Sequence, residues 1–397
     1  MAMRTFLVIP IIALLRYGGC GREAETPVSV ERKDGIEYVH NPRMPINPDS
    51  GISFEEDLSI ESKDKDGNIR IYYPSYFDVD EMGFIYIYDY KDPSVKVFDS
   101  QGEFVRTVGR KGNGPGEFQS AIRIALLPDR RLMILDYELR RTSIFSPDGQ
   151  FIESHQWQNL SFDIFLVTDS FYVREDTIFE PGQTPMTWKS KVHVKAYDFS
   201  GRELFSFGEF HARQSGFVNE GGRRFSFTLA FEVCSILAGD SVRGRLYHCL
   251  NDNYLIEVFD ENGKLFRKIE RPYEQLRVTA EDKKKYLDGF GVSETDRALI
   301  AKNVEMPALR PVTDRMLVDD SGYLWVKLNE EKEENGKILT AYDIFDEKGF
   351  YVHKVWSDIA PGLFRDGKMY SLEVEAETGE RVLKRYRVFK TRGLVHY

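Results

Sequence analysis

The chain has 397 residues, of which 42% are hydrophobic and 30% are charged, a balance that is typical of a folded globular protein and excludes a disordered one. Its formal net charge of −10 disfavours nucleic acid as a partner, because a nucleic-acid-binding surface needs an excess of Lys and Arg. The aromatic content of 13% suits a core built from strands.

The first twenty residues have the pattern of an export signal. Arg4 supplies a positive charge, residues 6–15 form an apolar run that is too short to span a bilayer, and two glycines precede Cys20. The pattern resembles a bacterial lipoprotein signal, which implies that Cys20 carries a lipid anchor. Arg16 and Tyr17 depart from that pattern. Simple secretion and a retained anchor are therefore the alternatives.

The predicted location is the bacterial cell envelope, on the periplasmic face or the cell surface, or outside the cell if the protein is secreted. Residues 1–20 are assigned to the signal and residues 21–51 to an N-terminal tether. We expect contact with the membrane through the lipid anchor only.

An apolar residue followed by an aromatic one recurs along the chain, each time with a glycine four positions after the aromatic. The aromatic residues of the copies are Phe98, Phe145, Tyr197, Phe259, Phe345 and Phe389. Each copy indicates a strand that runs into a tight turn, where the glycine is free to take a positive φ. A unit repeated every ~45 to 85 residues is typical of propeller blades.

The first two copies predict four antiparallel strands each, which is one blade. The strands are expected at 76–80, 84–89, 95–99 and 104–108, and then at 122–127, 132–136, 142–145 and from 151 onward. Looser copies predict four further blades over about 162–207, 231–269, 316–355 and 362–397. Blade five is expected to carry a charged loop over 329–337.

The sixth copy places its hairpin glycine, Gly393, almost at the last residue of the sequence, so blade six would lack an outer strand. We expect the segment 52–60 to supply that strand and to close the ring, because closure buries edges that would otherwise be exposed. The predicted fold is therefore all-β, a six-bladed β-propeller of four-stranded antiparallel blades over residues 52–397.

A short helical insertion is predicted between blades four and five, over residues 271–310. Thr279 and Ser293 are each followed three positions later by an aspartate, which is the pattern of a helix N-cap. Two short polar helices should lie on one face of the propeller. An extended linker between two domains is the alternative.

The most specific run of the sequence is residues 109–118, Gly-Arg-Lys-Gly-Asn-Gly-Pro-Gly-Glu-Phe, between an outer and an inner strand. With its flanking blades it resembles the NHL-repeat propellers and, more closely, the exported six-bladed β-propeller lipoproteins of bacteria. Residues 317–326 match that family again in blade five. The resemblance implies a fold and a binding role, and no single activity. A phosphate loop is not expected, because a strand and not a helix follows the glycines.

Three residues are candidate metal ligands. Asp89 and Asp136 end equivalent strands in blades one and two, and Asn251 occupies a comparable place in blade four. Their oxygens could hold calcium at the rim of the channel, as in a lactonase of the gluconolactonase type. The alternative is that they cap turns. No other cofactor is predicted, because the histidines lack a metal-binding spacing.

Arginines and cysteines supply the remaining candidates. Arg123, Arg140 and Arg310 lie at strand ends or between blades, and a cluster of them at the channel mouth would suit an anionic ligand. Ion pairing with the 64 acidic residues is the alternative. Cys234 and Cys249 lie on neighbouring predicted strands, where they form either a disulfide or two buried thiols.

The sequence favours a monomeric binding or interaction module without catalysis, whose partner is a protein or a small exported ligand. The alternative is a calcium-dependent hydrolase, lactonase or lyase of the gluconolactonase or NHL type, with its site at the mouth of the central channel.

Overall fold

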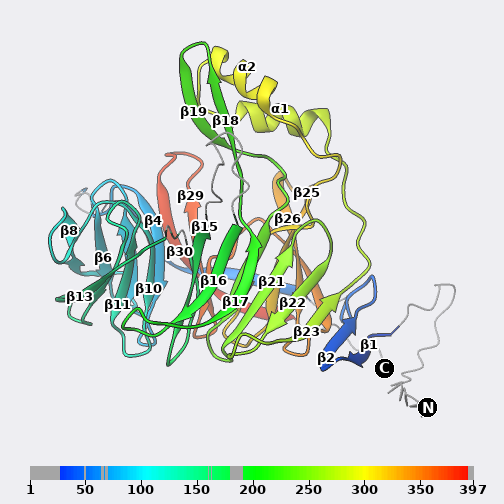
Figure 1. Cartoon of the computed structure of the whole chain (residues 1–397), viewed down its shortest axis with the longest axis horizontal. Helices are drawn as coiled ribbons and strands as arrows, with labels where there is room; N and C mark the ends of the chain where they lie inside the picture. Colours follow the sequence, from blue (N-terminus) through cyan, green and yellow to red (C-terminus); the bar gives the residue numbers. More distant parts are fainter. Residues whose placement is uncertain are drawn as a thin grey trace.

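Six sheets follow one another along the chain and form the blades of a six-bladed β-propeller (Figure 1). The computed structural model describes residues 27–48, 51–63, 67, 70–159, 161, 163–178 and 191–391. Within each blade the first strand is the innermost and successive strands pair antiparallel.

The first three blades are each built from four consecutive strands. Blade one contains β4 (Pro74–Val79), β5 (Ile85–Asp89), β6 (Ser94–Phe98) and β7 (Phe104–Val108). Blade two contains β10 (Ala121–Leu126), β11 (Leu132–Asp136), β12 (Arg141–Phe145) and β13 (Phe151–Gln156). Blade three contains β14 (Ile164–Val167), β15 (Tyr172–Ile178), β16 (Lys191–Tyr197) and β17 (Glu203–His211). The strands predicted for the first two blades are confirmed to within two residues.

The last three blades involve the N-terminal part of the chain as well. Blade four contains β20 (Ser235–Asp240), β21 (Arg245–Leu250), β22 (Leu255–Phe259) and β23 (Leu265–Glu270). Blade five contains β24 (Thr313–Val318), β25 (Leu324–Glu334), β26 (Lys337–Phe345) and β27 (Tyr351–Ser357). Blade six contains β28 (Leu363–Arg365), β29 (Lys368–Val374), β30 (Arg381–Thr391) and β3 (Gly51–Ile60).

Burial follows the position of a strand in its blade. The second and third strands of blade one, β5 and β6, are buried at every residue, because adjacent blades cover both of their faces. The outer strand β7 is mostly exposed. Hairpin glycines turn the third strand into the fourth at positive φ, 82° at Gly102 and 92° at Gly149, as the repeat predicts. Gly393 lies outside the described residues.

The ring is closed by the N-terminal segment. Strand β3 pairs antiparallel with β30, with Ile52 opposite Lys390 and Ile60 opposite Leu383. This confirms the expectation that the segment 52–60 completes blade six.

Residues 29–48 are more ordered than a tether. Strands β1 (Ser29–Lys33) and β2 (Ile36–His40) form a hairpin, and β2 adds to β23 in parallel, so blade four has six strands. The chain then crosses the outer edge of blade five, where the amides of Ile46 and Asn47 donate to the carbonyls of Tyr351 and Val352 (2.9 and 3.1 Å). Residues 29–60, which we call the strap, thus join blades four, five and six.

Two helices and a hairpin project from one side of the ring (Figure 1). Helices α1 (Ala280–Asp288) and α2 (Glu294–Asn303) begin after the predicted caps Thr279 and Ser293. The hairpin of β18 (Ser215–Glu220) and β19 (Arg223–Thr228) lies beside them and was not predicted. The two parts share a small core of Val218, Phe227, Ile300 and Val304. We call residues 215–228 and 280–303 the projecting module.

Other predictions have mixed outcomes. The charged loop expected over 329–337 is a continuation of β25 and β26 that turns at Asn335 and Gly336. No helix in the described ranges is long and apolar enough to cross a membrane. The predicted signal segment and Cys20 lie outside the described residues.

Cys234 and Cys249 are buried free thiols. Ile236 lies directly opposite Cys249 in the register of β20 and β21, so Cys234 is diagonal to Cys249 and not its cross-strand partner. A diagonal pair is too far apart for a disulfide without a shift of the backbone. Burial raises the pKa of Cys234 to about 11 and that of Cys249 to about 12.

Asn41 provides a test of the strap. Its side-chain amide donates to the carbonyl of Gly349 (2.9 Å), and its oxygen accepts from the amide of Tyr351 (2.8 Å). Asn41→Ala would leave both buried groups unpaired, so we expect a loss of about 2 kcal/mol in the free energy of unfolding. Urea unfolding followed by fluorescence measures it.

The control for this prediction is Asn262→Ala in an exposed hairpin, which should change stability by less than about 0.5 kcal/mol. Equal effects of the two substitutions would mean that the strap does not hold the blades together.

Candidate functional site

One face of the propeller collects the parts that vary between blades. The connections that enter the inner strands and the turns between second and third strands lie at the same end of the ring, because neighbouring strands alternate in direction. The projecting module leaves the ring at this end (Figure 1). We call it the upper face.

Three arginines lie on inner strands, which surround the axis of the ring. They are Arg123 on β10, Arg315 on β24 and Arg365 on β28, from blades two, five and six. Blades two and five lie opposite each other in a ring of six. Arg123 is nevertheless close enough to Arg315 for its positive charge to help lower the pKa of Arg315.

Two aspartates accompany these arginines. Asp163 forms an ion pair with Arg123 (Oδ1 to Nε, 3.1 Å), and Asp78 forms one with Arg365 (Oδ1 to Nη2, 3.7 Å). Burial raises the pKa of both carboxyls, and the neighbouring arginines oppose that effect. These five residues, Arg123, Arg315, Arg365, Asp78 and Asp163, are the axial cluster. It holds one more cation than anions when all are charged.

Arg315 is the least satisfied member of the axial cluster. Among the described residues, its side chain hydrogen-bonds only to the carbonyl of Gly362 (3.3 Å) and forms no salt bridge. Partial desolvation by the surrounding protein is the main cause of its lowered pKa, although Arg315 is an exposed residue. Nearby, the Nε atom of Arg365 and the Oδ1 atom of Asp314 are buried without a hydrogen-bond partner. Unpaired buried polar atoms of this kind are what a polar ligand or water would satisfy.

The other predicted arginines lie elsewhere. Arg140 is exposed in the turn between β11 and β12. Arg310 pairs with Asp282 (2.6 Å) and so ties α1 to the propeller. Of the three candidates, Arg123 alone belongs to the axial cluster. Arg315 and Arg365 were missed, although a charged residue inside an otherwise apolar inner strand was a usable signal.

The candidate metal ligands are engaged by backbone groups. Asp89 accepts from the amides of Tyr72 and Tyr73 (2.6 and 3.0 Å), and Asp136 accepts from Gln119 and Leu139 (2.7 and 3.1 Å). The amide of Asn251 likewise bridges three segments, through the Cys234 amide and the carbonyls of Glu232 and Thr313. These residues therefore tie the end of a second strand to the segment that enters the first.

That arrangement does not fit a calcium site, because the oxygens already accept from the backbone amides around them. Within the described ranges, no group of three or more His, Cys, Asp or Glu side chains is placed to hold a metal ion.

Two short segments, residues 212–214 and 229–234, join the projecting module to the propeller, and we call them the stem. Glu232 accepts from the amide of Gln214, across the two arms of the stem. Arg213, on the same stem, donates to the carbonyl of Asp314, the neighbour of Arg315 (3.3 Å). Burial raises the pKa of Glu232 to about 7, while the Gln214 amide and Arg213 oppose that shift.

Comparisons with known proteins agree with the fold. A family model described as 6-bladed beta-propeller (DUF5128) matches residues 74–201. A crystal structure of a DUF4221 family member from Bacteroides vulgatus is similar over 86% of this chain and 99% of that one, at 11% identity and a TM-score of 0.52. At such identity the likeness shows the fold alone.

Two further structures are similar at lower scores. A presumed exported protein from Bacteroides fragilis has 10% identity, a TM-score of 0.48 and coverage of 89% of this chain and 99% of that one. A gluconolactonase from Xanthomonas campestris has 12% identity, a TM-score of 0.41 and coverage of 84% and 89%. No curated protein matches the chain at a significant level.

The stem carboxyl predicts a dependence of stability on pH. The pKa of Glu232 is about 7 in the folded protein and lies above its ordinary value of 4.5, so the folded state favours the protonated form. The contribution of Glu232 to the stability of the fold is fully present below pH 4.5 and is lost as the pH rises through 7. Glu232→Gln mimics the protonated form and should escape that loss.

The free energy of unfolding of Glu232→Gln, relative to that of the wild type, should therefore be higher at pH 8 than at pH 5 by about 1 kcal/mol. This figure is reduced for partial solvent exposure. Urea unfolding at both pH values measures it, with Glu261→Gln in an exposed hairpin as the control. A constant difference between variant and wild type would contradict the prediction.

Proposed function

We propose that the protein is an exported binding module that holds a small anionic ligand at the axial cluster and catalyses no reaction. In this proposal the lipid on Cys20 tethers the propeller to the cell envelope, and the upper face meets the ligand. The observation that carries the proposal is that Arg123, Arg315 and Arg365 all lie on inner strands, and that Arg315 is paired with no carboxylate of the described residues.

The chemistry of the axial cluster favours a carboxylate. A guanidinium group presents parallel N–H donors that match a carboxylate in a bidentate manner, and Arg315 is exposed, so a ligand can reach it. Asp78 and Asp163 hold Arg365 and Arg123 in place, which leaves Arg315 to meet the ligand. The unpaired Nε atom of Arg365 offers a further donor.

The alternative, a calcium-dependent hydrolase, lactonase or lyase, needs several oxygens around one cation and a group to move a proton. The upper-face carboxylates of Asp89, Asp136 and Asp163 are instead bound to backbone amides or to an arginine. A binding role requires none of the missing parts, and for that reason we prefer it.

Arg315→Gln tests the binding site. Titration calorimetry of the purified mature protein with acetate, succinate and citrate at low salt should detect binding of at least one of them. We expect Arg315→Gln to weaken that binding at least tenfold, and Arg315→Lys to have a smaller effect because it keeps the charge without the bidentate geometry.

The matched control is Arg202→Gln, since the Arg202 side chain is 76% exposed on a hairpin of the opposite face. It should bind like the wild type. Unchanged binding by Arg315→Gln would remove the axial cluster as the site, and a failure of the wild type to bind any carboxylate would contradict the proposal as a whole.

The metal content separates the two functions. Elemental analysis of the purified protein should show no stoichiometric calcium, and EDTA should leave the thermal midpoint unchanged, because the candidate ligands are already bound to backbone amides. A tightly bound calcium ion whose removal lowers the midpoint would favour the hydrolase.

A further inference from the structure

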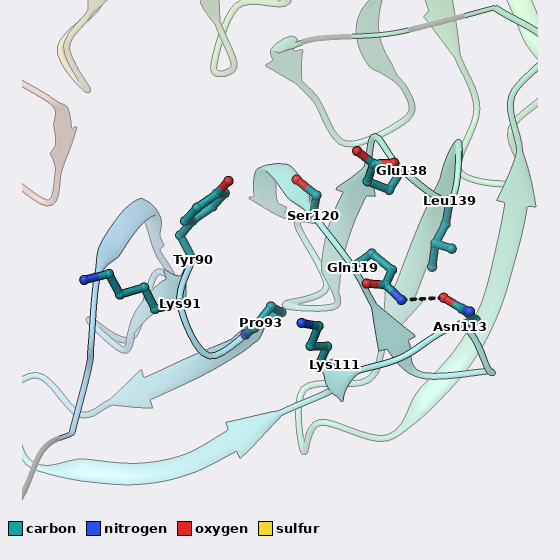
Figure 2. A pocket seen from close by; sticks show the side chains of 9 residues that line it. All are labelled: Tyr90, Lys91, Pro93, Lys111, Asn113, Gln119, Ser120, Glu138 and Leu139. Atoms are coloured by element: carbon teal, nitrogen blue, oxygen red, sulfur yellow. Dashed lines mark hydrogen bonds between the residues drawn. The ribbon is translucent and has the colours of Figure 1, made fainter. Parts of the chain in front are cut away.

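A hollow opens on the upper face between blades one and two (Figure 2). Its volume is about 570 Å³, within the range of small-molecule sites. It is bounded by the turn after β5, the turn after β11 and the glycine-rich linker between the two blades. None of its lining residues belongs to the axial cluster.

Both turns are held rigidly by the aspartates that end β5 and β11. Asp89 accepts from the amides of Lys91 and Asp92 (3.0 and 3.2 Å) in the first turn. Asp136 accepts from the amides of Gln119 and Leu139 (2.7 and 3.1 Å), which fixes the second turn against the linker. The walls of the hollow are therefore set before any ligand arrives.

The linker is fixed just as firmly. Arg141, which is buried, donates to the carbonyls of Gly114 and Glu117 (2.7 and 2.6 Å). The carboxylate of Glu117 accepts from the Gly114 amide (2.9 Å). A Cβ atom at Gly112 would lie 2.1 Å from that carboxylate, so the tight path requires a glycine there. A preformed wall lowers the entropy lost on binding.

The side chains that face this hollow include charges without ion-pair partners. Lys111 reaches into its middle, and Glu138 lies on the opposite wall (Figure 2). Neither forms a salt bridge with another residue in the described part of the chain. The ammonium of Lys91 lies 5.6 Å from the centre of the Tyr73 ring and not against a carboxylate.

Polar neutral groups and one aromatic ring complete the lining. The side chain of Gln119 donates to Asn113 (2.7 Å), which leaves its own oxygen exposed to the hollow, and the Ser120 hydroxyl lies near the centre (Figure 2). Tyr90 is 56% exposed at the rim. Such a ring offers a flat apolar face, while the amide, hydroxyl and carboxylate groups suit the hydroxyls of a ligand.

We propose that this hollow, the inter-blade site, binds an acidic sugar of the uronate class. Lys111 would pair with the sugar carboxylate, Gln119, Ser120 and Glu138 would bind its hydroxyls, and Tyr90 would stack on its ring. An anion without hydroxyls would use Lys111 alone and leave the remaining polar groups unmatched. The site is independent of the axial cluster, so either can fail without the other.

The test is calorimetric titration in the Arg315→Gln background, which removes the carboxylate site of the axial cluster. The ligand is digalacturonate, with galactobiose as the neutral probe and glutarate as the probe of charge alone. We expect Lys111→Gln and Tyr90→Ala each to weaken digalacturonate binding at least tenfold. Both residues are exposed, so the variants should melt like the wild type. Glutarate should bind at least tenfold more weakly than digalacturonate.

Two control variants make the outcome specific. Lys264→Gln, on an exposed hairpin of the opposite face, and Arg315→Gln, in the axial cluster, should both retain digalacturonate binding. Equal loss in Lys111→Gln and Lys264→Gln, or binding of glutarate as tight as that of digalacturonate, would overturn the proposal. Loss in Arg315→Gln alone would assign the ligand to the axis and overturn the inter-blade site, while leaving the axial proposal intact.

Discussion

The propeller depends on the pairing of β3 with β30, which joins the two ends of the ring. The paired residues are far apart in sequence, Ile60 opposite Leu383 and Ile52 opposite Lys390, so this pairing closes a loop that contains the other blades and costs conformational entropy. Blade six would otherwise end in an open edge. Strand β3 also packs closely against blade one, since a Cβ atom at Gly102 would lie 2.9 Å from Cδ1 of Leu58.

Buried arginines at the blade junctions then fix the angle between neighbouring sheets. Arg271, 4% exposed, pairs with Asp343 of blade five, which is fully buried and also accepts from the hydroxyls of Tyr254 and Tyr351 (both 2.6 Å). Arg385 of blade six bonds Asp57 and the Ser100 carbonyl of blade one (both 2.7 Å). A buried pair with every hydrogen bond made tolerates little displacement, so these junctions set the geometry of the axis.

The sequence was sufficient to predict the blades and insufficient to predict the site. The hairpin glycines mark turns at positive φ, and such turns can be predicted because they depend only on residues that are close together in the sequence. The strap hairpin was missed because β1 is polar and exposed at every residue, which resembles a tether. The hairpin of β18 and β19 was missed because only four buried residues unite it with the helices. Arg123 and Arg315 belong to blades two and five, which the closed ring places around one axis, so no spacing in the sequence relates them.

Asp89 and Asp136 show how the same pattern can be read in two ways. Their equivalent positions suggested convergent metal ligands, and in the structure each organises the backbone of its own turn. Because these acids bind backbone amides inside the loops, Lys111 and Arg315 have no carboxylate partner among the described residues. A chain of net charge −10 repels anions at long range. Salt screens that repulsion beyond about 8 Å, so an anionic ligand would be selected by these local pairs and not by the overall field.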